Sequence, residues 1–258
     1  MTYQAYGTPP GGPVTFRFGD VYGRSFSIFF SNILPYSVIA AIFLAPGLYF
    51  QTQLTGLVGR NPTVEMFQTA DYWLVFAGAL LVPMLGQMLS QLVIYSFSFQ
   101  AMRGRPLDVA GALSRVLGRL LPMIGTMLFY YVVVFVGTLL LFVPGIMLAI
   151  MLVAMLPVCL IERRGPIAAF ERSRELSKGS RWLIFATFLV FGVVGGIANL
   201  VIQQIATVAA GPTMAILASY PFVVVYTAFG AVLTISVYQE LLLVKEGPAA
   251  DRFAAVFD

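Results

Sequence analysis

The chain has 258 residues, of which 59% are hydrophobic and only 10% are charged, and its net charge is +4. Soluble domains carry about 25% charged residues, so the composition excludes an ordinary soluble protein and predicts one membrane domain without an appended soluble module. The absence of histidine excludes imidazole metal sites and histidine-based triads, and a single cysteine, Cys159, excludes an intrachain disulfide.

The two ends of the chain differ from its apolar middle. Residues 1–15 are rich in proline, glycine and polar side chains, and we predict a disordered tail there. They lack the basic-then-apolar layout of a cleavable signal peptide, so we expect the first span to serve as an uncleaved insertion signal. A single transmembrane domain is expected over residues 16–248, followed by a C-terminal tail over residues 249–258.

Six apolar segments are long enough, or nearly long enough, to cross a bilayer. A span needs about 20 apolar residues to cover roughly 30 Å of hydrocarbon. The predicted spans are 26–50, 72–99, 120–142, 146–161, 182–209 and 214–244. The fourth is the shortest and lies at the lower edge of the acceptable length. The expected fold class is therefore all-α, a polytopic protein with six transmembrane helices.

The basic residues lie in the connectors and at the ends of the chain. Only Arg60 falls in a connector on the opposite side; the others precede the first span, follow the sixth, or lie between spans two and three and between spans four and five. The positive-inside rule then places both termini and both basic connectors in the cytoplasm. The remaining connectors, 143–145 and 210–213, are uncharged and predict tight turns.

Three segments next to the spans combine apolar and charged residues with helical spacing. In residues 107–120 the apolar side chains fall on one side of a helical projection and the charges on the other, and residues 166–179 repeat the design. Residues 19–30 form a similar stretch. We predict two or three amphipathic helices at the membrane interface. Their expected partners are anionic phospholipid headgroups rather than nucleic acid. The candidate contact residues are Arg105, Arg115, Arg119, Arg163, Arg164, Arg172, Arg174, Lys178 and Arg181.

An internal repeat is suggested by two segments, FGDVYGRSFSIFFSNILPY and PLDVAGALSRVLGRLLPM. They share Asp-Val-x-Gly and then Leu-Pro where a span begins. This correspondence predicts three tandem units with pseudo-threefold repetition, each an interfacial helix followed by a two-span hairpin, over residues of about 16–100, 101–161 and 162–246. The alternative is chance similarity between apolar helices.

The stretch from Phe142 to Trp182 carries a further pattern. It has Pro-Gly at a turn, a short span that ends in Pro and then Glu, and an Ala-x-x-Arg-Ser-x-x-Leu-x-Lys-Gly-x-x-Trp helix. The residues are Pro144, Gly145, Pro157, Glu162, Ala169, Arg172, Ser173, Leu176, Lys178, Gly179 and Trp182. This pattern resembles the membrane domain attached to some bacterial glycerophosphodiester phosphodiesterases and the related YciC-like membrane proteins. The motif covers about forty residues, and the order of spans extends the likeness over most of the chain.

The resemblance implies the membrane module without the enzyme, because the soluble barrel that hydrolyses phosphodiesters in the fused relatives is absent. The sequence also departs from the pattern at Met151, where many relatives carry an arginine. That departure weakens any expectation of a buried charge relay in the short span.

Several residues of the motif have a structural and a functional interpretation. Glu162 lies among Arg163 and Arg164, with Arg105 as a further candidate partner, which favours a structural ion pair over a catalytic acid. Ser173 falls on an arc of small residues and has no general base nearby, which favours close helix packing over a nucleophile.

Two glycines of the motif predict backbone features. Pro144-Gly145 indicates a sharp turn between two spans. Gly179 suits the C-terminus of the preceding helix.

Polar side chains within the spans are few. Gln87 and Gln91 lie in the second span, and Asn199 and Gln203 share a face of the fifth. These amides favour hydrogen bonds between packed helices; the alternative is the lining of a polar cavity. Glu240 is the one acid inside a predicted span and lies near its end, which favours snorkelling or ion pairing at the interface over proton coupling.

Taken together, these observations and the resemblance favour a non-catalytic protein of the bacterial inner membrane that contacts lipids or a membrane partner through its basic interfacial helices. The alternative class is a transporter or channel that uses the amides of spans two and five. An intramembrane lipid-modifying enzyme is disfavoured because the sequence has no P-loop, dinucleotide glycine fingerprint, nucleophile elbow or metal-ligand cluster. We expect no metal and no cofactor, and a second copy of the chain is a candidate partner.

Overall fold

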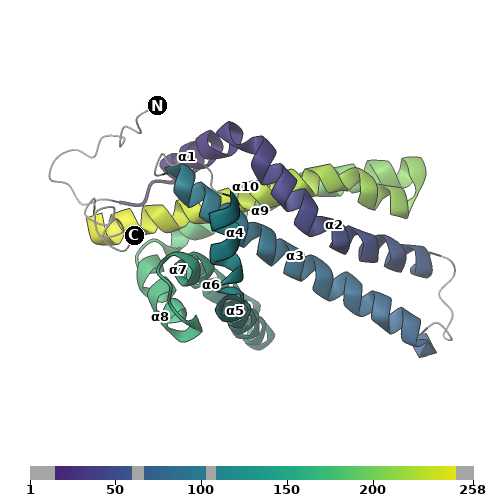
Figure 1. Ribbon diagram of the computed structural model, residues 1–258, viewed down its shortest axis with the longest axis horizontal. Coiled ribbons are helices and arrows are strands. Elements are labelled where there is room, and N and C mark those ends of the chain that lie inside the picture. Colours follow the sequence, from purple (N-terminus) through teal and green to yellow (C-terminus); the bar gives the residue numbers. More distant parts are fainter. Residues whose placement is uncertain (1–14, 60–66, 103–108, 248–258) are drawn as a thin grey trace. The chain divides into compact units, whose positions relative to one another are not determined.

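The computed structural model describes residues 15–59, 67–102 and 109–247. Every regular element in these ranges is a helix, which confirms the all-α class, and Figure 1 labels the helices in chain order. The predicted N-terminal tail up to residue 14, the C-terminal tail, Arg60 and Arg105 lie outside the described residues.

Six helical segments are long and apolar enough to cross a membrane. They are α2 (Ile33–Val58), α3 (Ala70–Met102), α5 (Leu120–Leu140), α6 with α7 (Phe142–Met151 and Met155–Ile161), α9 (Arg181–Ala210) and α10 (Pro212–Glu246). Shorter helices lie where interfacial helices are predicted, namely α1 (Phe18–Ser31), α4 (Val109–Leu117) and α8 (Pro166–Ser177). The chain is therefore a polytopic helical membrane protein, and the threefold repeat stays a prediction.

Four of the described helices begin with a proline at their third position. These are Pro35 in α2, Pro122 in α5, Pro144 in α6 and Pro157 in α7. A proline has no N–H, and its ring clashes with the carbonyl four residues earlier, so it kinks a helix, as inside α2, α3 and α10, or ends it there. In the first turn the missing N–H is harmless, because it would have no intrahelical partner. The preceding helix accordingly ends at, or shortly before, the residue four positions upstream.

This proline effect corrects two predicted spans. The first begins at Ile33 rather than at residue 26, because α1 continues to Ser31 and a new helix starts there with Pro35 in its first turn. The fourth is not one continuous helix: it is broken at residues 152–154, ahead of Pro157. Pro35 and Pro157 therefore lie in the first turn of a helix, whereas Pro46 of the first span lies inside α2.

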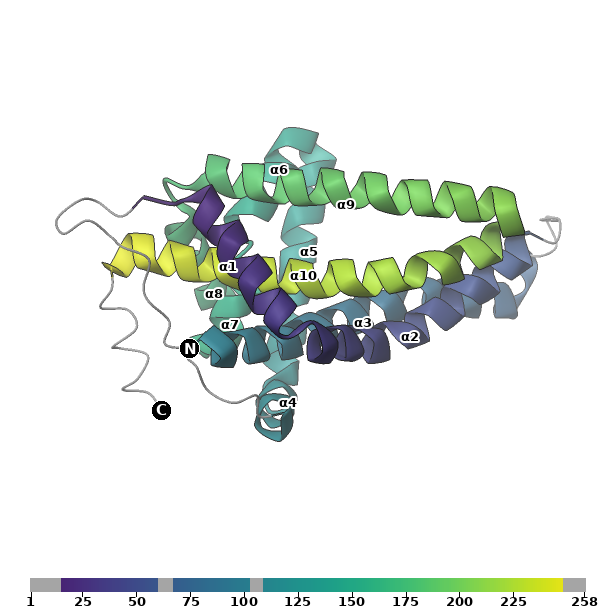
Figure 2. The ribbon, with the colours of Figure 1, turned by 90° about the horizontal axis from the view of Figure 1, so that it is seen from above.

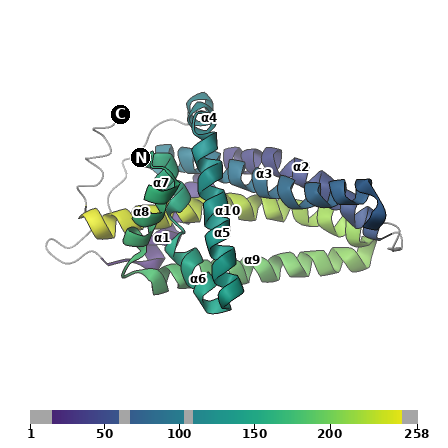
Figure 3. The same ribbon diagram turned by 90° about the horizontal axis from the view of Figure 1, so that it is seen from below.

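The turn between the third and fourth spans also differs from the prediction. It is the single residue Leu141, which is extended (φ −162°, ψ 140°), and Pro144 and Gly145 lie inside α6. Gly145 serves close packing instead, because a Cβ there would lie 2.1 Å from the Thr138 Oγ1 of α5. Figure 3 shows α5 and α6 side by side as the hairpin that results.

The chain divides into two compact units. Unit one comprises residues 1–30, 95–189 and 232–258, and unit two comprises residues 31–94 and 190–231. Helices α3, α9 and α10 contribute a segment to each unit.

Within unit two, α2 and α3 run side by side (Figure 1). Their backbones approach closely at Gly86 of α3, where a Cβ would lie 2.1 Å from the carbonyl oxygen of Phe43 in α2. A second close approach pairs Gly47 of α2 with Pro83 of α3. The absence of a side chain at Gly86 is what permits this contact.

The unit-two segments of α9 and α10 are antiparallel neighbours (Figure 2). Gly211, with φ +84°, ends α9 close to the predicted turn, and Pro212 begins α10. Phe191 stacks on Tyr226 with ring centroids 4.2 Å apart. The Tyr220 hydroxyl of α10 donates a 2.6 Å hydrogen bond to the Ala41 carbonyl, which joins α10 to α2.

Unit one contains α4 to α8, most of α1 and the adjoining ends of α3, α9 and α10. Helices α5 to α8 pack on one another, and α8 buries most of the arc predicted from its sequence: Ala169, Ser173, Leu176 and Ser177. Figure 2 shows α1 crossing the ends of α9 and α10. There the Tyr22 hydroxyl donates a 2.8 Å hydrogen bond to the Thr187 carbonyl of α9.

Candidate functional site

Unit one carries a group of charged and polar side chains around Glu162, which follows the last residue of α7. The Glu162 carboxylate accepts hydrogen bonds from Arg172 Nε at 3.2 and 3.3 Å and from the Tyr238 hydroxyl at 3.0 Å. Arg164 Nε lies 2.9 Å from the same carboxylate. One acid thus joins α8, α10 and its own connector. We name this group the Glu162 cluster: Glu162, Arg164, Arg172, Tyr238 and Glu246.

Arg172 extends the cluster along α8 and to α10. Its guanidinium donates to Glu246 in the last turn of α10 and lies 3.9 Å from Glu175 on α8. The side chain is 17% exposed. Burial lowers the pKa of Arg172, but the hydrogen bond to Glu246 and the charge of Glu162 outweigh it, so the pKa of the guanidinium is raised above its ordinary value. Arg172 is therefore a permanently charged link between α8 and α10.

The observed partners of Glu162 differ in part from the predicted ones. Arg164 is a partner, whereas Arg163 makes no ion pair within the described ranges, and Arg105 lies outside them. The contacts from Arg172 and Tyr238 were not expected from the sequence. The sequence indicated these contacts only indirectly. A connector rich in arginine packs against the polar ends of neighbouring spans, but the sequence does not say which spans these are.

Arg119, one of the predicted headgroup contacts, caps a helix. Its Nη1 donates to the Cys159 carbonyl at 2.9 Å, and its Nη2 donates to the Arg163 carbonyl at 3.0 Å. The last carbonyls of a helix have no intrahelical partner, and a cation there is favoured by the helix dipole. Arg163 itself has a φ of 57°, which arginine rarely adopts. The Arg119 guanidinium thus secures both the end of α7 and the turn that follows.

Ser173 caps another helix end. Its hydroxyl is buried and donates a 2.9 Å hydrogen bond to the carbonyl of Met151, the last residue of α6. The break before Pro157 leaves this carbonyl without an intrahelical partner, and the hydroxyl supplies one. Ser173 therefore packs on the small-residue arc that the sequence predicts, and it also makes a hydrogen bond that the sequence did not indicate.

A second buried ion pair joins α1 to α10. Arg24 Nη2 lies 3.2 Å from Glu240, whose side chain is only 5% exposed. The backbone N–H of Arg17 donates to the same carboxylate at 3.4 Å. The one acid inside a predicted span is thus ion-paired, and its partner comes from the other end of the sequence.

The basic residues predicted to contact headgroups fall into distinct groups. Some serve internal contacts in unit one, namely Arg119, Arg164 and Arg172. Others are exposed and have no ion-pair partner within the described ranges, namely Arg115, Arg163, Arg174 and Lys178. Arg181 is half-buried, and its Nε has no hydrogen-bond partner among the residues that the structure describes.

The amides predicted for a polar cavity all lie in unit two. Gln87 accepts a 3.2 Å hydrogen bond from the Thr227 hydroxyl of α10, and Gln91 is half-buried. Asn199 is half-buried, and its Oδ1 has no hydrogen-bond partner among the described residues. Gln203 is exposed. The hydrogen bond of Gln87 therefore joins α3 to α10 rather than to α9.

No group of three acidic or cysteine side chains that could hold a metal ion occurs within the described ranges. Comparisons with protein families, curated proteins and solved structures found no match for this chain. The family resemblance of the motif between Phe142 and Trp182 therefore stays a prediction. What the structure itself supports is the class: a polytopic helical membrane protein with a charged cluster in unit one.

Proposed function

We propose that this chain is a non-catalytic protein of the bacterial inner membrane that contacts anionic lipid headgroups through its interfacial helices. The observation that carries the proposal is the set of exposed cations on or beside α4 and α8 that have no ion-pair partner within the described ranges: Arg115, Arg163, Arg174 and Lys178. Each such cation near an anionic surface contributes about 1 kcal/mol to binding.

The apolar side chains around these cations support an interfacial position. On α4, Leu113 and Leu117 are exposed on the helix that also presents Arg115. On α8, Ile167 is exposed, and it lies one helical turn before the first charged residues of that helix. A short helix with both apolar and cationic side chains exposed on its surface is suited to the boundary between acyl chains and headgroups.

The proposal is non-catalytic because the two candidate catalytic residues make structural contacts. The Ser173 hydroxyl is buried and bonded to the Met151 carbonyl. The Glu162 carboxylate accepts from Arg172 and Tyr238 and pairs with Arg164. These contacts support a structural role for both groups.

The orientation proposed with this function places both termini and both basic connectors in the cytoplasm. It rests on the positive-inside rule, since all the lysines and arginines except Arg60 lie in those connectors or at the ends of the chain. Anionic lipids of the cytoplasmic leaflet would then face α4 and α8.

The test is lipid binding by the full-length protein in dodecylmaltoside, followed by native mass spectrometry with dioleoylphosphatidylglycerol and dioleoylphosphatidylcholine. We expect the wild type to prefer phosphatidylglycerol. The triple variant Arg115→Gln, Arg163→Gln, Arg174→Gln should bind it more weakly, by about fivefold per charge removed. The difference should shrink as salt is added, because these cations are exposed.

The matched control replaces the same arginines by lysine, which keeps the charge and should retain most of the affinity. Equal affinity of the glutamine variant and the wild type for phosphatidylglycerol would contradict the proposed function. The observation that favours the transporter alternative is the Asn199 Oδ1, which has no hydrogen-bond partner among the described residues, whereas Gln87 is bonded to Thr227 and Gln203 is exposed.

A further inference from the structure

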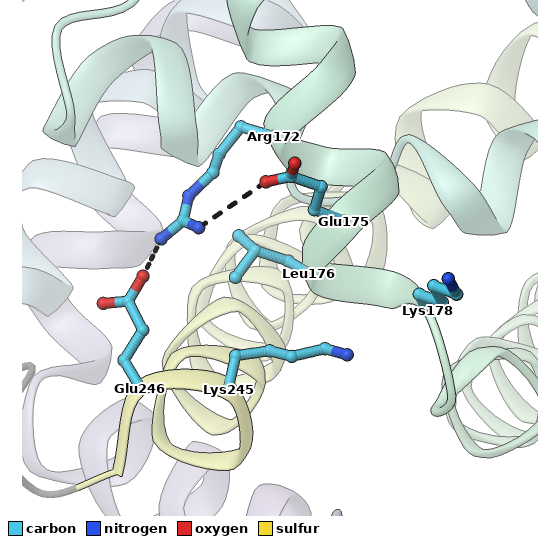
Figure 4. A pocket seen from close by; sticks show the side chains of 6 residues that line it. All are labelled: Arg172, Glu175, Leu176, Lys178, Lys245 and Glu246. Atoms are coloured by element: carbon cyan, nitrogen blue, oxygen red, sulfur yellow. Dashed lines mark hydrogen bonds and ion pairs between the residues drawn. The ribbon is translucent and has the colours of Figure 1, made fainter.

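The end of α8 and the last turn of α10 form an open cleft in unit one, with a volume of about 280 Å³. We name it the α8–α10 cleft. Figure 4 shows the side chains that line it: Arg172, Glu175, Leu176, Lys178, Lys245 and Glu246. The cleft shares Arg172 and Glu246 with the Glu162 cluster, whereas its two lysines lie outside that cluster.

The charges in the cleft are unevenly matched. Arg172 donates to Glu246 and lies 3.9 Å from Glu175, so these three charges offset one another in part. Lys178 and Lys245 are exposed, and neither has an ion-pair partner in the described part of the chain. Figure 4 shows both ammonium groups on the side of Leu176 that faces away from the Arg172–Glu246 contact. That side of the cleft presents two cations without a counter-ion.

The backbone positions of the two lysines follow from the helix ends. Lys178 directly follows the last residue of α8, and Gly179, with φ +92°, turns the chain away from the helix axis. Lys245 lies in the last turn of α10. Two like charges that line one cleft repel each other, and a bound anion would offset that repulsion and accept charge-assisted hydrogen bonds.

We propose that the α8–α10 cleft binds a phosphate group through Lys178 and Lys245. A phosphate carries several strong acceptor oxygens, so a single group can accept hydrogen bonds from both ammonium ions. The inference rests on the proposed function, because it assigns one defined headgroup site to α8. The source is the phosphodiester of a phospholipid or a free phosphate ion, which share this chemistry.

The position of the cleft along the chain fits a lipid phosphate. Trp182, at the start of α9, is 82% exposed. Tryptophan is enriched at the headgroup level of bilayers, where its ring lies partly in the apolar layer and its N–H reaches water. Lys178 and Trp182 are four residues apart in the chain, across the turn between α8 and α9.

The experiment measures stepwise binding of dioleoylphosphatidylglycerol to the full-length protein in dodecylmaltoside by native mass spectrometry. The double variant Lys178→Gln, Lys245→Gln should weaken the binding of the first lipid by about 25-fold, as expected for two charges each worth about fivefold. The variant Lys178→Arg, Lys245→Arg should keep the affinity within a few-fold of the wild type. A second arm titrates sodium phosphate against sodium chloride at equal ionic strength.

The matched control is Arg163→Gln, Arg174→Gln, which removes two exposed, unpaired cations that do not line the cleft. It should leave the first binding step nearly unchanged and weaken the later ones. Lysine-dependent binding of the lipid or of inorganic phosphate supports the cleft and identifies the source. First-lipid and phosphate affinities that are the same in the glutamine variant and the wild type would overturn it, as would an equal loss in the control.

The two proposals fail in different ways. If only the later steps depend on charge, through Arg115, Arg163 and Arg174, the interfacial role stands and the cleft is wrong. If the triple arginine variant binds like the wild type, the general role is wrong, whatever the lysines do.

Discussion

The interactions within unit one differ in kind from those within unit two. All the ion pairs among the described residues lie in unit one, including those of Glu162, Arg172 and Glu240. Unit two has a single charged residue in its described part, Asp71. Its helices meet instead through close backbone contacts such as Gly86 and through aromatic stacking such as Phe191 on Tyr226.

The difference follows from what each unit contains. Apolar side chains bring no net driving force between helices in hydrocarbon, so association there depends on close packing and on a few hydrogen bonds. Where helix breaks and connectors leave carbonyls and charges to be satisfied, side-chain donors such as Arg119 and Ser173 take that role. Substitutions should therefore have opposite profiles in the two units: loss of charge should matter in one and gain of volume in the other.

The largest effect is expected from Glu162→Gln. It leaves Arg172 and Arg164 without their shared carboxylate, and removing one partner of a largely buried pair costs about 3 kcal/mol of unfolding free energy. Unfolding by SDS titration in dodecylmaltoside measures it. The matched control is Glu171→Gln, which removes an exposed carboxylate of α8 with no ion pair among the described residues and should change little. Equal stability of both variants would contradict the role of the Glu162 cluster.

A somewhat smaller effect is expected from Gly86→Ala in unit two. The added Cβ would lie 2.1 Å from the Phe43 carbonyl oxygen, so α2 and α3 must move apart, at a cost of about 2 kcal/mol. Gly192→Ala is the control, because a Cβ on Gly192 meets nothing within 4 Å. The same SDS titration applies. A Gly86→Ala protein as stable as Gly192→Ala would show that close packing at this contact is not required.

The smallest effect separates capping from lipid contact. Arg119→Gln removes two hydrogen bonds from a charged donor to the carbonyls at the end of α7, which should cost about 1.5 kcal/mol. Arg115 lies four residues before Arg119 in the chain. The variant Arg115→Gln should leave the unfolding free energy unchanged and weaken phosphatidylglycerol binding. If Arg119→Gln left stability unaltered, Arg119 would belong with the exposed cations instead.

The number and approximate position of the spans could be predicted from the sequence. Hydrocarbon excludes ionised side chains, so long uncharged stretches mark helices such as α5, α9 and α10. The helix starts did not follow from the prolines alone. Pro35 and Pro157 lie inside the predicted spans 26–50 and 146–161, and each stands at the third position of a new helix, whereas Pro46, Pro83 and Pro221 lie inside continuous helices. Every proline clashes with the carbonyl four residues upstream, so this clash does not by itself decide between a kink and a new helix.

The charged contacts could not be predicted in the same way. Glu162 and Tyr238 are 76 residues apart, and Arg24 and Glu240 are 216 apart, so no local periodicity relates them. Helical spacing placed Arg119 on a polar face, but whether a guanidinium on that face meets lipid or a carbonyl depends on how α7 packs. Only the assembled helices decide it.

Cys159 has practical value because of where it lies. Its side chain is fully buried, and Thr126 of α5 donates to its Sγ at 3.3 Å, so the only thiol of the chain is shielded between α5 and α7. A water-soluble maleimide should find no target on the folded protein, and its reaction rate would report the opening of this helix pair. Single cysteines can also be introduced at exposed positions as spectroscopic labels without first removing the native one.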